Sequence, residues 1–368
     1  MRRSITRFLT SPLGMIVTGG LIGLIAATLQ KFGNPPNMGF CVACFERDIA
    51  GALGLHRAAV VQTLRPEIPG LLLGGTLGAL LFGEWRARAG GAALVRFLLG
   101  VFAMIGALVF LGCPWRALLR LAGGDLNALL GLAGLLAGLS LGAMFTRRGF
   151  SLGGASPTRS LQGWLMPLLM LGLLLLALIQ PGFLFQSEKG PGALSAPALL
   201  SLGGALLVGL LAQRARFCTI GAFRNAFFAR DWHLFYAALS LVAVAFLANL
   251  AYGQFKLGYA AMPVAHSAWL WNFLGMALAG LAFHLAGGCP GRQLILAGEG
   301  SGDSAVFVLG MIVGGGVAHN FLLAAGPDKL ADGVLKVGGP GPNGQVAVIV
   351  GLVFTVLVGM LMRDRETA

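Results

Sequence analysis

Four of the five cysteines in this chain form two pairs with nearly the same spacing. Cys113 follows Cys41 by 72 residues, and Cys289 follows Cys218 by 71. The second cysteine of each pair lies in the same short motif, Gly-Cys-Pro-x-Arg. A thiol is a soft group and a weak hydrogen-bond donor. Its repetition at matching places therefore indicates a pathway for a soft anion.

Arginines recur at fixed distances from these cysteines. One lies six residues after the first cysteine of each pair, and another lies three residues after the second cysteine; they are Arg47, Arg224, Arg116 and Arg292. A guanidinium is permanently charged and costly at membrane depth, so a function or a partner is expected for each. We predict that they hold an anion. The alternatives are a local ion pair, or a side chain that reaches the membrane interface.

The proline in each Gly-Cys-Pro-x-Arg motif predicts that a helix begins at the cysteine. Proline suits the first position of a helix because its missing N–H would have no partner there. The free N–H groups and the positive end of the helix dipole then point toward the cysteine, and such a terminus binds anions. We therefore expect Cys113 and Cys289 at the starts of short helices.

Cys44 lies outside the repeat and forms a C-x-x-C motif with Cys41. Such a motif alone indicates dithiol redox chemistry or half of a metal site. The chain has no second C-x-x-C and its histidines lack ligand spacing, so we predict no metal and no cofactor. Cys44 is expected to line the same pathway. His284, five residues before Cys289, is the candidate for proton coupling, and the alternative is a hydrogen-bonded interface histidine.

Composition places these residues in a membrane. The chain has 368 residues, of which 57% are hydrophobic and 11% are charged, against about 25% charged in soluble proteins. The apolar runs are near 20 residues long and lack strand-like alternation, so we predict an all-α integral membrane protein rather than a barrel. The net charge of +13 comes mostly from short loops, which favours topology signalling over nucleic-acid binding.

The hydropathy pattern predicts about ten transmembrane helices. They are expected near 12–30, 66–83, 93–112, 126–145, 161–181, 196–213, 232–252, 268–287, 304–324 and 344–362. Four shorter, Gly-interrupted segments carry the paired cysteines and lie at 38–55, 113–124, 217–230 and 288–301. We interpret these as short re-entrant helices, because irregular backbone is tolerated at membrane depth only where protein or a water-filled cavity surrounds it.

The order of these segments predicts a 5+5 inverted repeat around a central pathway. The second pair of cysteines begins five spans after the first, and an odd offset makes the two copies face opposite ways. We expect a first repeat at 1–150, an inter-repeat linker and fifth span at 151–195, and a second repeat at 196–368.

Charges in the loops predict the orientation. Arginines gather in alternate loops, whereas the loops at 182–195, 253–267 and 325–343 carry only scattered lysines. Loops rich in Lys and Arg face the cytoplasm, so both termini of this multi-pass protein are expected there, in a bacterial inner membrane. The arginines assigned to that side are Arg2, Arg3, Arg7, Arg86, Arg88, Arg147, Arg148, Arg214, Arg216, Arg363 and Arg365.

These motifs make the chain similar to a known family. Over nearly its whole length it resembles the YeeE/YedE family of bacterial inner-membrane proteins, most specifically in the stretches Arg216–Asn225 and Ala286–Cys289. The stretch Asn37–Asp48 is similar to the branch associated with selenium metabolism. The resemblance implies uptake of thiosulfate past cysteines along a constricted central path. That role would fall on the cysteines that match the family motif, which are Cys113, Cys218 and Cys289, with Cys41 as the fourth repeat position.

The resemblance and the residues together predict a transporter for a small sulfur- or selenium-containing anion. Cys44 has no place in the repeat, and this extra thiol favours a selenium species as substrate. One alternative is a membrane thiol enzyme or carrier that forms a covalent sulfur or selenium adduct. Another is a membrane subunit that docks a soluble sulfur- or selenium-handling protein on its cytoplasmic face. The repeat favours transport, and no nucleotide-binding motif is present.

Overall fold

The long apolar runs form helices close to where the sequence predicts them. In the computed structural model, which describes residues 2–363, the short helix α1 (Arg2–Leu9) precedes the first span. The ten long helices are α2 (Pro12–Lys31), α4 (Glu67–Phe82), α5 (Ala93–Phe110), α7 (Asn127–Arg147), α8 (Ser160–Ile179), α9 (Ala198–Arg214), α11 (His233–Ala251), α12 (Trp269–Ala286), α14 (Gly302–Asn320) and α15 (Pro342–Leu361).

These helices confirm an all-α membrane protein. Nine helical segments among residues 2–363 are long and apolar enough to cross a membrane. The remaining predicted span, α4, has 16 residues and is shorter than the others. The strands of the described chain are two small antiparallel pairs outside the helices: β1 (Arg88–Ala89) with β2 (Ser156–Pro157), and β3 (Lys329–Ala331) with β4 (Val334–Lys336).

Glycines allow the long helices to pack closely in pairs. The principal pairs are α2 with α11, α4 with α9, α5 with α14, and α7 with α12, and α5 also packs on α12. A Cβ at Gly19 of α2 would lie 1.9 Å from the Ala237 carbonyl oxygen of α11, and one at Gly74 of α4 would lie 2.2 Å from the Leu206 carbonyl oxygen of α9. Without side chains at these positions the backbones touch, which is how helices associate in lipid.

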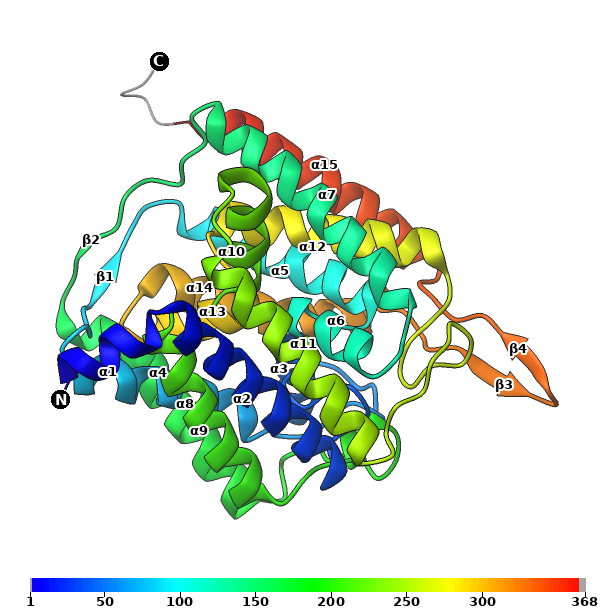
Figure 1. Cartoon of the computed structure of the whole chain (residues 1–368). Coiled ribbons are helices and arrows are strands. Elements are labelled where there is room, and N and C mark those ends of the chain that lie inside the picture. Colours follow the sequence, from blue (N-terminus) through cyan, green and yellow to red (C-terminus); the bar gives the residue numbers. More distant parts are fainter. Residues whose placement is uncertain (1, 364–368) are drawn as a thin grey trace.

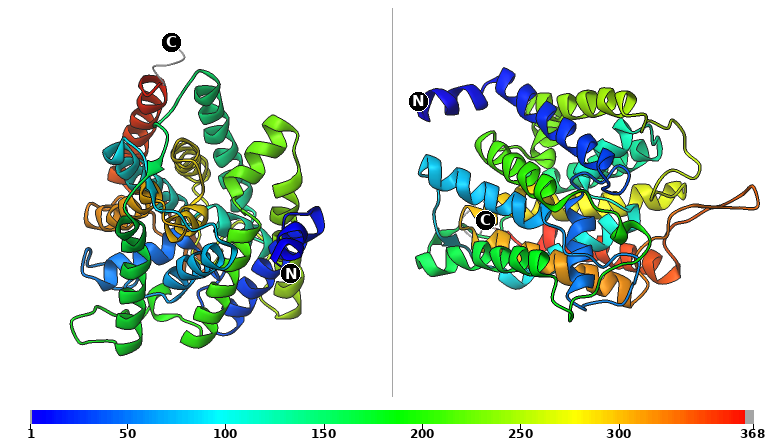
Figure 2. Two further views of the ribbon diagram at one scale, coloured as in Figure 1. Left: turned by 90° about the vertical axis from the view of Figure 1, so that its left-hand side faces the viewer. Right: turned by 90° about the horizontal axis from the view of Figure 1, so that it is seen from below.

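Loops that are distant in sequence meet at the two ends of the bundle. At one end β1 pairs with β2, the Arg86 N–H donates to the Glu299 carbonyl, and Phe150 pairs with Arg363. The β3–β4 hairpin protrudes from the opposite end, far from the N-terminus (Figures 1 and 2). Successive loops therefore alternate between the two ends of the bundle, as the loop charges predict. Arg365 lies outside the described residues. Which end faces the cytoplasm stays a prediction.

Four short helices lie among the long ones and carry the cysteines. They are α3 (Val42–Ala52), α6 (Pro114–Ala122), α10 (Thr219–Arg224), which continues as a π-helical turn (Asn225–Ala229), and α13 (Pro290–Gly298). A 3-10 turn at Pro191–Ala193 completes the helical elements of the described chain. Every residue of α3 is buried, and α3 packs mainly on α14. Figure 1 shows α3, α6 and α13 in the interior of the bundle.

Candidate functional site: two cysteine clusters and an arginine vestibule

Three cysteines from the first half of the chain gather in one place. Cys41 precedes α3 and its sulfur accepts the Cys44 N–H (3.4 Å). The Cys41 thiol also lies within hydrogen-bond reach of the Cys44 and Cys113 thiols. All three residues are buried. We call Cys41, Cys44 and Cys113 the three-cysteine cluster.

The other two cysteines form a second cluster with matching local geometry. Cys218 precedes α10 and its sulfur accepts the Gly221 N–H at 3.4 Å, as Cys41 does from Cys44. The Cys289 N–H donates to the Cys218 sulfur (3.5 Å). Both cysteines are buried and both are free thiols. We call Cys218 and Cys289 the two-cysteine cluster.

Each of the four repeated cysteines lies at the N-cap of a short helix. Cys113 and Cys289 precede α6 and α13, and a proline follows each at the first helical position. The first N–H groups of a helix have no partner within the helix, and they point back toward its N-cap. The four helix starts therefore direct N–H groups and partial positive charge toward the thiols, an arrangement that suits anions.

Two aromatic rings join the clusters. Trp115, two residues after Cys113, contacts Phe217, which immediately precedes Cys218, with ring centroids 5.7 Å apart. Both side chains are buried, and the Trp115 Nε1–H has no hydrogen-bond partner among the described residues. The indole fills the space above Gly291, where an added Cβ would lie 2.6 Å from the ring. Trp115 and Gly291 occupy the same variable position, x, in the two Gly-Cys-Pro-x-Arg motifs.

Arg116 brings an uncompensated positive charge to the three-cysteine cluster. Its side chain is 0% exposed. Its Nη1 lies 3.7 Å from the Cys44 sulfur and donates to the Leu111 carbonyl, and its Nη2 donates to the Val264 carbonyl (3.0 Å). Within the described chain no carboxylate pairs with it. A buried cation without a counter-ion is costly, so this position is suited to receive an anion.

Arg120, one turn later on α6, is also fully buried but has a partner. Its Nε donates to Asp125 at 2.6 Å, and its guanidinium lies over the Phe110 ring, 4.2 Å from the centroid. The two arginines therefore differ in the one property that matters for an anion site: the charge of Arg120 is neutralised and that of Arg116 is not.

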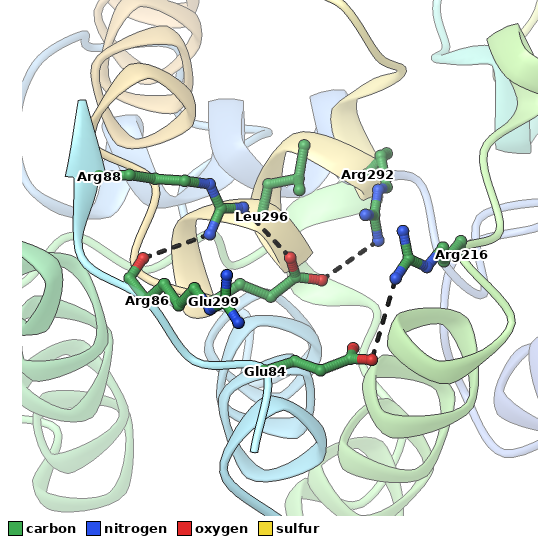
Figure 3. Close-up of a pocket in the computed structure, with 7 residues that line it drawn as sticks. All are labelled: Glu84, Arg86, Arg88, Arg216, Arg292, Leu296 and Glu299. Atoms are coloured by element: carbon green, nitrogen blue, oxygen red, sulfur yellow. Dashed lines mark hydrogen bonds and ion pairs between the residues drawn. The ribbon is translucent and has the colours of Figure 1, made fainter. Parts of the chain in front are cut away.

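A cavity of about 540 Å³ opens beside the two-cysteine cluster, at the end of the bundle that carries β1 and β2. Figure 3 shows its lining, which is Glu84, Arg86, Arg88, Arg216, Arg292, Leu296 and Glu299. Arg292 follows Cys289 by three residues, and Arg216, with a side chain 68% exposed, precedes Cys218 by two. We call this cavity the arginine vestibule.

Carboxylates hold the vestibule arginines without cancelling their charge. Glu299 pairs with Arg88 and with Arg292, at 3.3 Å in each case. Glu84 pairs with Arg214 at 3.0 Å and lies 3.9 Å from Arg216. Partial burial raises the pKa of Glu84, but hydrogen bonds from Gln213 and Arg214 outweigh this, so its pKa is lowered and it stays ionised. Four arginines against two glutamates still leave a positive lining.

The remaining predicted residues lie outside these contacts. Arg47 pairs with Asp48 at 2.6 Å, and Asp48 also pairs with Arg65 at 3.0 Å, so Arg47 belongs to a buried ion network beside the three-cysteine cluster. Arg224 is exposed at the end of α10, where its guanidinium donates to Asn225 (3.3 Å). His284 shares a hydrogen bond with the Thr146 hydroxyl (2.9 Å).

Sequence reasoning missed several residues that the structure brings to the site. Trp115 and Gly291 lie inside the repeated motifs, and their mismatch is a signal that the sequence contains. The sequence predicts Arg216 on the cytoplasmic side and gives no sign that it lines a cavity beside Cys218. Arg65 lies 17 residues from Asp48, and only the fold reveals their pairing.

Comparisons with known proteins find similarity to sulfur-transport proteins. The Sulphur transport family matches residues 214–367, which include the two-cysteine cluster. The chain is also similar to the thiosulfate transporter TsuA of Escherichia coli (strain K12), with 37% identity over 100 residues. That alignment covers 26% of this chain and spans about a quarter (27%) of TsuA. The selenium branch stays a prediction, but these two matches confirm the resemblance to the YeeE/YedE family that the cysteine motifs predict.

Proposed function

We propose that this protein transports a small sulfur-containing anion across a membrane through the two cysteine clusters. The observation that carries the proposal is Arg116, a fully buried guanidinium without a carboxylate partner in the described chain, beside three thiols. The similarity to the Sulphur transport family and to a thiosulfate transporter supports the same class of substrate. Thiosulfate, a divalent anion with one soft sulfur end, fits both the thiols and the cation.

The anion moves along a chain of weak sites. From one side it meets the three-cysteine cluster with Arg116, then the Trp115–Phe217 pair, then the two-cysteine cluster and finally the arginine vestibule. Thiols are weak donors, so no single site binds strongly enough to trap the ion, and several weak sites favour passage. The vestibule lies at the end of the bundle where the sequence predicts the cytoplasm, and its positive lining attracts the emerging anion.

Two opposed copies of one unit explain this arrangement. We infer a 5+5 inverted repeat in which α2 to α8 correspond to α9 to α15. The helix pairs support this repeat. If each helix is replaced by its counterpart in the other half, the pair α2 with α11 becomes α9 with α4. In the same way α5 with α14 becomes α12 with α7, and all four pairs are observed. A repeat of this kind places one cysteine cluster on each side of a central constriction.

Uptake of radiolabelled thiosulfate by proteoliposomes of the purified protein tests the proposal. We expect uptake by the wild type and a loss of roughly 10- to 150-fold in Cys289→Ala. This range corresponds to one hydrogen bond to a charged group, about 1.5–3 kcal/mol. Cys289→Ser keeps a hydroxyl donor at the same place and is expected to retain more uptake than Cys289→Ala.

The same assay separates the proposal from its alternatives. Wild-type vesicles that take up no sulfur or selenium anion contradict it. Mass spectrometry of the protein after exposure to thiosulfate is expected to find unmodified cysteines. A persulfide on Cys41 or Cys44 would instead indicate a covalent carrier.

Cys44 is the residue that we propose for a selenium substrate. Its counterpart at the start of α10 is Gly221, because each donates its N–H to the preceding cysteine sulfur. Cys44 therefore adds a thiol, in contact with Arg116, that the other half lacks. Radiolabelled selenite in the same assay tests this role: Cys44→Gly is expected to lose selenite uptake more than thiosulfate uptake, and equal losses would rule it out.

The vestibule arginines are expected to matter less than the buried one. Arg292→Gln should lower thiosulfate uptake roughly fivefold, because a partly exposed charge contributes about 1 kcal/mol to attraction of an anion. The loss should shrink at high ionic strength, since salt screens charges that solvent reaches.

Arg224→Gln is the matched control for this prediction. Arg224 makes its hydrogen bonds to Asn225, is exposed, and contributes to neither cysteine cluster nor the vestibule. We therefore leave it out of the proposed pathway and expect uptake unchanged within twofold. Uptake that falls equally in Arg224→Gln and Arg292→Gln would contradict the assignment of the vestibule.

A further inference from the structure

Glu46 is a buried carboxyl group that the proposed pathway does not use. It lies on α3, two residues after Cys44, and is 0% exposed. Neither of its carboxyl oxygens has a hydrogen-bond partner among the described residues. Buried polar groups are nearly always paired, so an acid with both oxygens unpaired calls for a functional reason.

The surroundings of Glu46 are apolar. Residues four apart share a helix face, so Glu46 lies on the face of α3 that carries Ala50. Ala50 and the backbone of Arg47 lie against Gly315 of α14. Further along α14, the Asn320 side chain donates to the Leu55 carbonyl, beyond the end of α3. The turn of α14 before Gly315, which includes Met311 and Ile312, is buried and apolar.

Charged and titratable groups on the helices that pack against α3 are engaged elsewhere. On α14, Asp303 pairs with Arg96 of α5, and the His319 ring lies 4.6 Å from that of His56. On α4, Glu67 accepts hydrogen bonds from Asn34 and Ser201. Arg292 of α13 pairs with Glu299, which immediately follows that helix, and on α3 itself Arg47 pairs with Asp48. None of these groups pairs with Glu46.

Desolvation decides the protonation state of Glu46 in this structure. An ionised carboxylate without a single donor in an apolar setting costs far more than the neutral acid, and such groups become neutral instead. Glu46 therefore holds a proton here. The ionised form would have to turn toward a cation such as Arg47, the next residue along α3.

We propose that Glu46 is a proton-binding site whose proton accompanies the anion, an inference that rests on the proposed transport function. With Glu46 neutral, the charged groups around the three-cysteine cluster are Arg47, Arg65 and Arg116 against Asp48, a surplus of two positive charges. A divalent anion balances this surplus and so favours the neutral acid. When the anion leaves, the uncompensated cations lower the affinity of Glu46 for its proton. Because this coupling is reciprocal, the protonated acid also favours anion binding.

Infrared spectroscopy of the purified, full-length protein tests for the proton without any transport. At neutral pH we expect the carbonyl stretch of a protonated carboxyl group in the wild type, its loss in Glu46→Gln, and its persistence in Glu67→Gln. Glu67 is the matched control because it is a buried glutamate with hydrogen-bond donors, which glutamine retains at its oxygen. A band that survives in Glu46→Gln overturns the proposal.

Transport in proteoliposomes tests the coupling. Thiosulfate entry into wild-type vesicles is expected to acidify the lumen, as reported by an internal pH-sensitive dye, and an inward proton gradient should raise uptake. In Glu46→Gln the acidification should vanish and the gradient should no longer raise uptake, whereas Glu67→Gln should behave as the wild type. Glu46→Leu, which suits the apolar surroundings, gives a second variant if the glutamine protein does not fold.

The outcomes separate this inference from the proposed function. If Glu46→Gln loses the infrared band but still couples proton entry to thiosulfate uptake as the wild type does, the coupling role is overturned. Wild-type thiosulfate uptake without lumenal acidification overturns it as well. If the wild-type protein takes up no sulfur anion, the transport proposal is refuted. If the infrared band is nevertheless lost only in the Glu46 variants, Glu46 remains a proton-binding site.

Discussion

Arg116→Gln is expected to abolish thiosulfate uptake while leaving the protein at least as stable as the wild type. A buried charge interacting with an anion about 4 Å away contributes of the order of 4 kcal/mol, so its loss lowers uptake roughly a thousandfold. The fold loses little, because Arg116 has no carboxylate to leave unpaired and glutamine can still donate to one of the two carbonyls. Proteoliposome uptake and thermal unfolding in detergent measure the two effects.

Arg120→Gln is the matched comparison, since both side chains are fully buried on α6. Here the substitution leaves Asp125 buried without its partner, and breaking such a pair costs about 3–5 kcal/mol. We expect a markedly lower unfolding temperature for Arg120→Gln and not for Arg116→Gln. If Arg116→Gln retains uptake within threefold, the buried cation does not hold the anion and the pathway is wrong.

Gly291→Val is expected to block the constriction between the two cysteine clusters. A Cβ at Gly291 would lie 2.6 Å from the Trp115 ring, so the branched side chain must push the indole toward Phe217 or distort α13. We expect uptake to fall more than tenfold, together with a loss of stability of about 1–3 kcal/mol from overpacking. Uptake and thermal unfolding are again the measurements.

Rescue distinguishes a blocked path from a damaged fold. Trp115→Ala removes the ring that valine meets, so the double variant Trp115→Ala/Gly291→Val should regain uptake relative to Gly291→Val alone. Gly172→Val on α8 is the control, because an added Cβ there meets nothing within 4 Å. Wild-type uptake in Gly291→Val, or a double variant that is stable but equally inactive, would exclude Trp115 and Gly291 from the constriction.

The helices were predictable because their signals are local. Apolar runs near 20 residues located the long helices to within a few residues; α14, for example, spans Gly302–Asn320 against a predicted 304–324. The proline after Cys113 and Cys289 likewise predicted that α6 and α13 begin at those cysteines, as they do. In each case the information lies within a turn or two of the residue concerned.

The state of each arginine was not predictable, because it depends on partners distant in sequence. The same Gly-Cys-Pro-x-Arg motif leaves Arg116 in the interior without a counter-ion and pairs Arg292 with Glu299. One of the two carbonyls that accept from Arg116 belongs to Val264, 148 residues away. Glu46 and Asp48 both adjoin Arg47 in the sequence, yet only Asp48 pairs with it. That these side chains conduct an anion stays a prediction.

The two arginines of α6 also bear on how the chain is assembled during synthesis. Placing an arginine at the centre of an isolated helix in a bilayer costs about 2.5–3.5 kcal/mol, so α6, with Arg116 and Arg120, is a poor candidate to enter lipid by itself. The carbonyl of Val264 and the packing surface of α11 both come from the second half of the chain, which the ribosome makes later. We therefore expect α6 to remain at the membrane surface or in the insertion machinery until the second half emerges, so that the two halves mature only together.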